Sequence, residues 1–374
     1  MAEQKTEHVK RMIVRYIREQ QLKRGERLPS QDFFRQKFSC GTTTVRAAIE
    51  ELKNDGVLEV RDKVGVYVID PNADGHTASV IGICAIYSDS PYYCCLLCAI
   101  QSHLNRLGCM AHLFFKYRPD DRTSPDLYYD ISDYPGLARS VESKILDGII
   151  HLDDFNDRAL RFFAKAGIPT LSAGGLPLSE NSVSYDLGDI LRRMCVRLKK
   201  MNVTCPALVS VKTTEAHIDP LFLKYTGGQG IILSNEVFTD DGSRFIERFM
   251  ALPEDRRPDL ILYMDDILAQ AITSKLVFLL PREKLPKAMI FRSRQLQTIF
   301  AVENPVFFNM DLDHFAALIV NTLMKNVKIG NIHIGRICYR PEEQPEFSLK
   351  QKTDGLSVPE KINGGKIKEC EIMM

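Results

Sequence analysis

The sequence predicts a small α+β domain at the N-terminus and a larger α/β domain of two lobes after it. The first seventy residues carry three amphipathic helical segments and then two alternating segments typical of a hairpin. The rest alternates unbroken apolar runs with helical segments, which is typical of parallel sheets covered on both faces. A polar, turn-rich stretch at 70–77 separates the two parts, so we expect domains at 1–69 and 78–340 with a linker between them.

The composition excludes several classes of protein. A chain of 374 residues exceeds the usual size of a protein with a single hydrophobic core. Its 45% of apolar residues is ample for globular packing. Its 49 basic and 48 acidic residues give a net charge of +1, so the charge of the whole chain favours neither nucleic acid nor membrane. Without an apolar leader or a run approaching the roughly 18 residues of a membrane span, we expect a cytoplasmic protein with no membrane association.

The ten cysteines predict reduced thiols rather than disulfides, because most stand inside apolar runs that should be buried. Examples are Cys84, Cys109, Cys195 and Cys338. One cluster, formed by Cys94, Cys95 and Cys98, contains a C-x-x-C spacing, but no second Cys or His pair follows at zinc-finger distance. We therefore favour a core helix here over metal or redox chemistry, and we expect no metal and no cofactor.

The N-terminal pattern predicts three helices in order. Apolar residues recur at helical spacing from His8, Ser30 is a suitable N-cap for a second helix, and a third helix ends before Gly56. Alternating residues at 58–61 and 65–69 then predict a hairpin. Three helices followed by a hairpin form a winged helix-turn-helix, a fold that binds DNA.

This segment resembles the DNA-binding domain of the GntR family. The resemblance is carried by Gly25-Glu26-Arg27-Leu28-Pro29-Ser30, Thr43-Thr44-Val45-Arg46, Ala48-Ile49-Glu50-Glu51-Leu52 and Asp55-Gly56-Val57-Leu58. In that family the third helix enters the major groove and the wing approaches the minor groove. Hydroxyls at a helix N-terminus followed by an arginine suit contacts to phosphates and base edges. The DNA contacts predicted on this basis are Ser30, Gln31, Arg35, Thr42, Thr43, Thr44, Arg46, Lys63 and Gly65.

The chain departs from the family pattern at three positions in or next to these predicted DNA contacts. Asp32 and Thr42 stand where arginines are usual, and Lys63 replaces a wing glycine. Residues 1–70 hold 14 basic and 11 acidic residues, which is a modest excess for a DNA-binding domain. Asp32 would repel a phosphate, so we expect an unusual operator, a weaker complex, or contacts shifted to Arg35, Lys37 and Lys63. Alternatively, the domain keeps its fold but has lost tight DNA binding.

Nine apolar runs predict the strands of the larger domain, too many for one compact sheet of usual size, so two Rossmann-like lobes are expected. The runs are 80–87, 110–115, 148–152, 168–172, 207–211, 230–233, 260–264, 288–291 and 306–308. Because ligands of open α/β sheets bind where strands end, side chains there are candidates for a binding site. They are Ser88, Asp89, Tyr92, Tyr93, Asp153, Ser172 and Asp266, and the resemblance described next adds Asp186.

This half resembles the ligand-binding domain of the LacI and GalR regulators, which has the type I fold of periplasmic binding proteins. The matching segments include Ile81-Gly82-Ile83, Asp147-Gly148-Ile149-Ile150, Gly167-Ile168-Pro169-Thr170, Val183-Ser184-Tyr185-Asp186 and Asp265-Asp266-Ile267-Leu268-Ala269. A GntR-type domain joined to a LacI-type sensor is similar to the arabinose-repressor type of bacterial regulator. The resemblance implies a homodimer that binds palindromic operator DNA, and a repressor of carbohydrate-metabolism genes.

A small polar ligand, a sugar or a derivative of one, suits the candidate carboxylates and aromatic rings. Relatives place a sugar-clamping arginine shortly after the strand equivalent to 207–211, where this chain has residues 212–217 with no arginine. Either a different polar ligand binds, or the pocket has drifted and the domain serves dimerisation. We expect 116–135 to be a surface excursion and 341–374 an unstructured tail.

Two other functions remain as alternatives. The first is a small-molecule-binding protein whose winged helix has lost tight specific DNA binding. The second is an enzyme, but the sequence contains no G-x-G-x-x-G after the first strand, no phosphate-binding P-loop, no G-x-S-x-G and no H-E-x-x-H. We therefore expect no enzymatic activity.

Overall fold

The computed structural model describes residues 2–62, 64–71, 78–86, 91–116, 128–175, 179–211, 214–236, 241–296 and 298–341. Three predicted site residues, Lys63, Ser88 and Asp89, lie outside the described residues. So do most of the linker and the predicted tail from residue 342 onward.

The N-terminal domain has the predicted winged-helix fold. Its elements are α1 (Ala2–Glu19), α2 (Gln31–Lys37), α3 (Thr42–Asn54), β1 (Leu58–Arg61) and β2 (Gly65–Val68). Apolar faces of the three helices meet around the fully buried ring of Phe34. Ser30 caps α2 as predicted, since its Oγ accepts a hydrogen bond from the Phe33 backbone N–H at 3.2 Å. Strands β1 and β2 pair antiparallel and form the wing.

The first lobe of the larger domain is built on a six-stranded parallel sheet in the order β15-β9-β8-β6-β3-β4. In chain order the strands are β3 (Val80–Ile86), β4 (Met110–Lys116), β6 (Gly148–His151), β8 (Thr170–Gly174), β9 (Ser182–Tyr185) and β15 (Arg336–Tyr339). Its helices are α4 (Pro91–Arg106), α5 (Leu137–Glu142), α6 (Asp157–Lys165) and α11 (Leu312–Ile329).

The second lobe is built on a five-stranded parallel sheet in the order β11-β10-β12-β13-β14. The strands are β10 (Pro206–Val211), β11 (Ile231–Glu236), β12 (Leu260–Tyr263), β13 (Lys287–Ser293) and β14 (Val306–Met310). Its helices are α7 (Leu187–Leu198), α8 (Glu215–Thr226), α9 (Ser243–Ala251) and α10 (Asp266–Leu279). Each of the nine predicted strands overlaps a strand of the structure, which confirms the α/β fold class.

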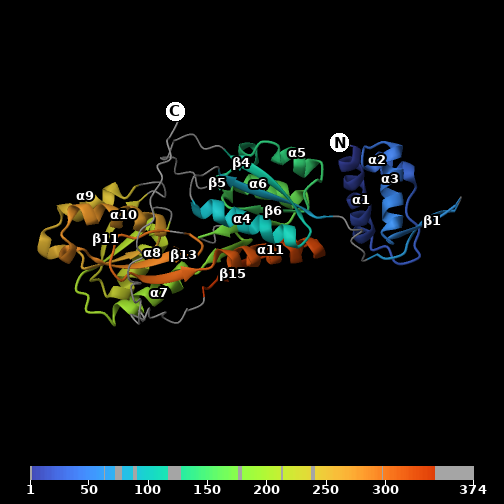
Figure 1. Cartoon of the computed structure of the whole chain (residues 1–374). Helices are drawn as coiled ribbons and strands as arrows, with labels where there is room; N and C mark the ends of the chain where they lie inside the picture. Colours follow the sequence, from blue (N-terminus) through green and yellow to red (C-terminus); the bar gives the residue numbers. More distant parts are fainter. Residues whose placement is uncertain are drawn as a thin grey trace, which may run out of the picture. The chain divides into compact units, whose positions relative to one another are not determined.

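The chain passes twice between the lobes. It leaves the first lobe after β9, builds the second lobe, and returns after β14 through α11, which packs on α4 (Figure 1). The first lobe is therefore assembled from two separate stretches of sequence, whereas the second is continuous. The carboxyl ends of both sheets supply the residues of the cavity described below.

The structure corrects two expectations about individual residues. Cys94, Cys98 and Cys338 are exposed, because the first two lie on the outer side of α4 and the third on edge strand β15. The described part of 116–135 is not a surface excursion throughout. β5 (Tyr128–Tyr129) pairs with β7 (Asp154–Phe155), and Tyr134 is buried against Phe155 with ring centres 5.2 Å apart.

Candidate functional site

The start of α3 is an exposed, positively polarised helix end. Thr42, Thr43 and Arg46 are exposed there, and the first turn contains no acidic residue. The N-cap residue, Gly41, has no side chain to occupy the free N–H groups of the first turn. A helix end of this kind attracts phosphate oxygens, and the nearby guanidinium can reach a phosphate or a base edge. Thr44, the remaining predicted contact of α3, is half-buried.

A groove between α2 and the wing brings together three other predicted contacts, Ser30, Gln31 and Gly65. Gly65 has φ +147°, and a Cβ at this position would lie 2.6 Å from Nε of Arg27. The positive φ favours glycine at this position, and any other residue would also have to displace the Arg27 side chain. Arg35 is exposed on α2, but its Nε donates to Oδ1 of Asp32 at 3.3 Å, so part of its charge is compensated within the helix.

A cavity of about 190 Å³ lies in the larger domain and is lined from both lobes. The first lobe contributes Tyr92, Tyr93, Leu152, Ala173, Gly174, Gly175 and Tyr185; the rest of the lining is Leu187, Val211, Thr214, Met264, Asp265, Asp266, Phe291, Arg292, Ser293 and Met310. Three predicted residues, Tyr92, Tyr93 and Asp266, are among them. The volume is below the roughly 300–1,000 Å³ typical of sites for drug-sized ligands, which favours a small ligand.

Two successive carboxyl groups stand at the start of α10. Asp265 caps the helix by accepting the Leu268 N–H at 2.8 Å, and Asp266 accepts the Ser293 N–H at 2.9 Å. Burial, followed by repulsion from Asp265, raises the pKa of Asp266 to about 7. Near neutral pH, Asp266 can therefore both accept and donate a hydrogen bond to a ligand.

Aromatic side chains form the wall of the cavity contributed by the first lobe. The ring of Tyr92 stands edge-on to Tyr93 and to Tyr185, with ring centres 5.5 and 6.4 Å apart. Among the described residues, the buried hydroxyls of Tyr92 and Tyr185 have no hydrogen-bond partner. Burial also raises the pKa of Tyr92, so this phenol keeps its proton. Both hydroxyls require a ligand or bound water to satisfy them.

Arg292 was not predicted, and it supplies a cation to the cavity. It lies near the end of β13, where its Nε donates to Oδ1 of Asn309 on neighbouring β14 at 2.7 Å. Its guanidinium carbon lies 3.7 Å from the centre of the Phe307 ring. Arg292 and Ser293 directly follow the predicted strand 288–291, so the rule that selected Asp266 could have found them. By the same rule, Asp265 and Ala173, which directly follow the predicted strands 260–264 and 168–172, could also have been found.

The other three described candidates make bonds within the protein and do not line the cavity. Asp153 accepts the Ile86 N–H at 2.7 Å, and Ser172 donates to Oδ1 of Asp154 at 2.8 Å. Asp186 caps α7. Ser172 lies one residue before the end of β8 that reaches the cavity, which is lined by Ala173, Gly174 and Gly175.

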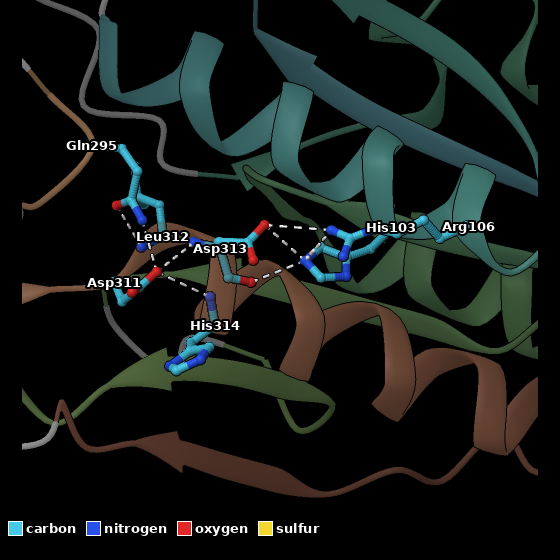
Figure 2. A network of polar contacts seen from close by, with 7 residues as sticks. All are labelled: His103, Arg106, Gln295, Asp311, Leu312, Asp313 and His314. Carbon is cyan, nitrogen blue, oxygen red and sulfur yellow. Dashed lines mark hydrogen bonds and ion pairs between the residues drawn. The ribbon is translucent and has the colours of Figure 1, made fainter.

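A polar network surrounds the passage from β14 into α11, where the chain returns to the first lobe (Figure 2). Asp311 caps α11 and also accepts Nε2 of Gln295 at 2.7 Å, while Oε1 of Gln295 accepts the Leu312 N–H at 2.9 Å. One residue further, Oδ1 of Asp313 lies 3.0 Å from Nε2 of His103 on α4. The network fixes the first turn of α11 to both lobes.

Neither a membrane span nor a metal site is found in the part of the chain that the structure describes. No helix there is long and apolar enough to cross a bilayer. No group of three or more His, Cys, Asp and Glu side chains there is placed to hold a metal ion.

A winged helix joined to a two-lobed α/β domain places the chain in the class of winged-helix DNA-binding proteins with a second, larger domain. Residues 5–68 match the family model of bacterial regulatory proteins of the gntR family, and the N-terminal domain belongs to that family. No curated protein matches the sequence.

Solved structures of LacI-type regulators share the fold over most of the chain. The Lac repressor bound to ONPG in the repressed state has 14% identity and a TM-score of 0.56, and the match covers 80% of this chain and 88% of that chain. The LacI family regulator CCPA from Weissella paramesenteroides, with bound sucrose, has 10% identity and a TM-score of 0.56, covering 71% and 97%. A LacI family regulator from Bifidobacterium animalis subsp. lactis has 16% identity and a TM-score of 0.55, covering 71% and 94%. The larger domain thus has the fold of these LacI-type regulators.

Proposed function

We propose that the protein represses carbohydrate-metabolism genes as a homodimer on a palindromic operator, with a sugar or sugar derivative in the cavity as its effector. The observation that carries the proposal is the cavity lined from both lobes, which combines carboxyl groups, tyrosine hydroxyls and aromatic rings. Such a lining suits a ligand with several hydroxyls. One regulator of the same fold, CCPA from Weissella paramesenteroides, has been solved with bound glucose and with bound sucrose, which supports this choice. The regulator would act in the cytoplasm, where bacterial operators are found.

The proposed mechanism couples closure of the lobes to the spacing of two winged helices. Each winged helix of the dimer contacts one half-site, so operator affinity depends on the distance between them. A ligand that contacts both lobes binds best when they are closed. It changes operator affinity only through its different affinities for the open and closed arrangements.

Replacing Arg46 tests the recognition helix. We expect Arg46→Ala to abolish sequence-specific DNA binding and leave ligand binding unchanged, because Arg46 is exposed beside the start of α3 and lies in the other domain from the cavity. The measurement is binding of the full chain to operator fragments selected from a random DNA pool, over a range of salt concentrations. Arg161→Ala, at an exposed position of α6, is a control with the same change of charge.

Unchanged operator affinity in Arg46→Ala would refute the assigned recognition helix. If the wild-type chain itself enriches no sequence but binds a ligand, the protein is the small-molecule-binding alternative. The compensation of Arg35 by Asp32 is the observation that favours this second candidate.

A further inference from the structure

We infer that the effector carries an anionic oxygen group, a carboxylate or a phosphate, which Arg292 binds inside the cavity. The inference rests on the proposed function in one respect: it takes the cavity to be the effector site. It narrows the ligand from sugars in general to sugar acids or sugar phosphates.

The geometry of Arg292 is that of a fixed anion receptor. Its planar guanidinium lies against the Phe307 ring, and the Nε–Oδ1 bond to Asn309 fixes the rotation of the group. This arrangement uses one of the five N–H donors of the side chain. The two terminal nitrogens form a fork that matches the paired oxygens of a carboxylate or phosphate.

No carboxylate of the protein occupies that fork among the residues that the structure describes, where Arg292 has no ion pair within 4.0 Å. The nearest candidate in the lining is Asp266, but its Oδ2 is bonded to the Ser293 backbone N–H. Asp266 attracts the guanidinium only at longer range. A half-buried, unpaired guanidinium in a cavity therefore calls for a charged partner from outside the chain.

The remaining polar groups define the rest of the ligand. The unpartnered hydroxyls of Tyr92 and Tyr185 and the carboxyl group of Asp266 can all exchange hydrogen bonds with hydroxyl groups. Aromatic rings beside them suit the apolar face of a sugar ring. A hydroxylated body with one anionic group satisfies both parts of the lining.

Neutral sugars and their acid or phosphate derivatives, compared in pairs, separate the effect of ligand charge on affinity from that of ligand shape. The full chain is titrated calorimetrically with glucose, gluconate, glucuronate and glucose 6-phosphate, and with galactose, galacturonate and galactose 6-phosphate. We expect at least one anion to bind roughly tenfold or more tightly than its neutral parent, because hydrogen bonds to charged groups are the stronger ones. The acid and phosphate arms show which anionic group the site takes.

Substitutions at Arg292 then assign the binding to this residue. Arg292→Gln should weaken the anion roughly ten- to a hundredfold and leave the neutral parent almost unchanged. The affinity of Arg292→Lys for the anion should lie between those of the wild type and Arg292→Gln, because lysine keeps the charge but lacks the forked pair of N–H donors. Arg294→Gln is the matched control, since Arg294 is exposed two residues along and outside the cavity lining. Thermal melting of each ligand-free variant checks that it is folded.

Three results would overturn the inference: a neutral parent that binds as tightly as its acid and phosphate, an anion whose affinity survives Arg292→Gln, or no binding by any of the anions. A neutral sugar that binds at least as tightly as every anion and changes operator affinity would overturn this inference alone and leave the proposed function standing. Failure of the proposed function is seen separately, in the selection of operator DNA.

Discussion

Asp266 connects the charge of the ligand to the pH of the solution. Its pKa of about 7 results from burial and from the neighbouring Asp265. Besides Asp265, the charged or titratable groups that act on it in the described cavity are Arg292 and Tyr92. A bound anion would add negative charge near this carboxyl group and would therefore favour its neutral form.

We predict that affinity for an anionic effector falls as the pH rises through 7. The bound anion raises the pKa of Asp266 further, so binding takes up a proton, and the limit of the effect is a tenfold loss per pH unit. Calorimetric titrations between pH 6 and 8.5 measure this dependence. Asp266→Asn, which keeps an acceptor for the Ser293 N–H, should flatten the profile. An affinity that rises with pH, or the same profile in both proteins, would contradict the assignment.

Asp32 limits the DNA affinity of α2 in the same electrostatic terms. We predict that Asp32→Asn strengthens DNA binding several-fold and steepens its salt dependence by about one unit, because Arg35 becomes available for one more phosphate. Surface ion pairs of this kind contribute little to stability, so the melting temperature should hardly change. Equilibrium binding to the selected operator at several salt concentrations tests this. Glu50→Gln, which breaks the Glu50–Lys53 pair of α3, is the matched control; an equal effect there would speak against a specific role for Arg35.

At the scale of single elements, strands with a clear apolar run could be predicted, including the edge strands β4, β11 and β14, whereas β9 and β15 were not among the predicted strands. β12 (Leu260–Tyr263) is completely buried, and its apolar run predicts it. β15 lies at the edge of its sheet and is partly exposed, and its short apolar run around Cys338 was not among the nine predicted as strands. The same holds for the residues of the cavity. Asp266 could be predicted because it follows a predicted strand. Tyr185 could not, because its strand, β9, alternates serines with apolar residues and is recognised only in the packed sheet.

The wing depends on one glycine, and we predict that Gly65→Ala destabilises the N-terminal domain by about 1 kcal/mol or more. The φ of +147° disfavours any side chain, and Arg27 would have to leave its place beside the strand. Thermal unfolding measured with the full chain gives the change, and operator binding should weaken with it. Val64→Ala, at the exposed neighbouring position, is the control. Equal melting of the two variants would show that Arg27 moves at no cost.

For the whole molecule, the fold class followed from the order of helices and apolar runs, while the lining of the cavity did not. The lining depends on two sheets meeting at their carboxyl ends, which single runs do not encode. Arg292 and Tyr92 come from different lobes and lie 200 positions apart in the sequence, so only the assembled domain brings them to one cavity.

Coupling between the two domains makes a reciprocal prediction. If the effector changes operator affinity by some factor, the operator must change effector affinity by the same factor, typically about 5- to 150-fold. Effector titrations of the full chain with and without operator duplex measure the change in effector affinity. Operator titrations with and without effector measure the change in operator affinity. A scrambled duplex is the control. Equal effector affinity in all three conditions would show that the cavity does not regulate DNA binding.

The divided first lobe also determines the order in which the protein is built on the ribosome. The winged helix is complete once β2 has been made, and the second lobe once β14 has been made. The first lobe must wait for α11 and β15, because α11 packs on α4 and β15 pairs with β9. Domains generally fold as units during synthesis. A growing chain can therefore present a folded DNA-binding domain before the cavity that would control it exists.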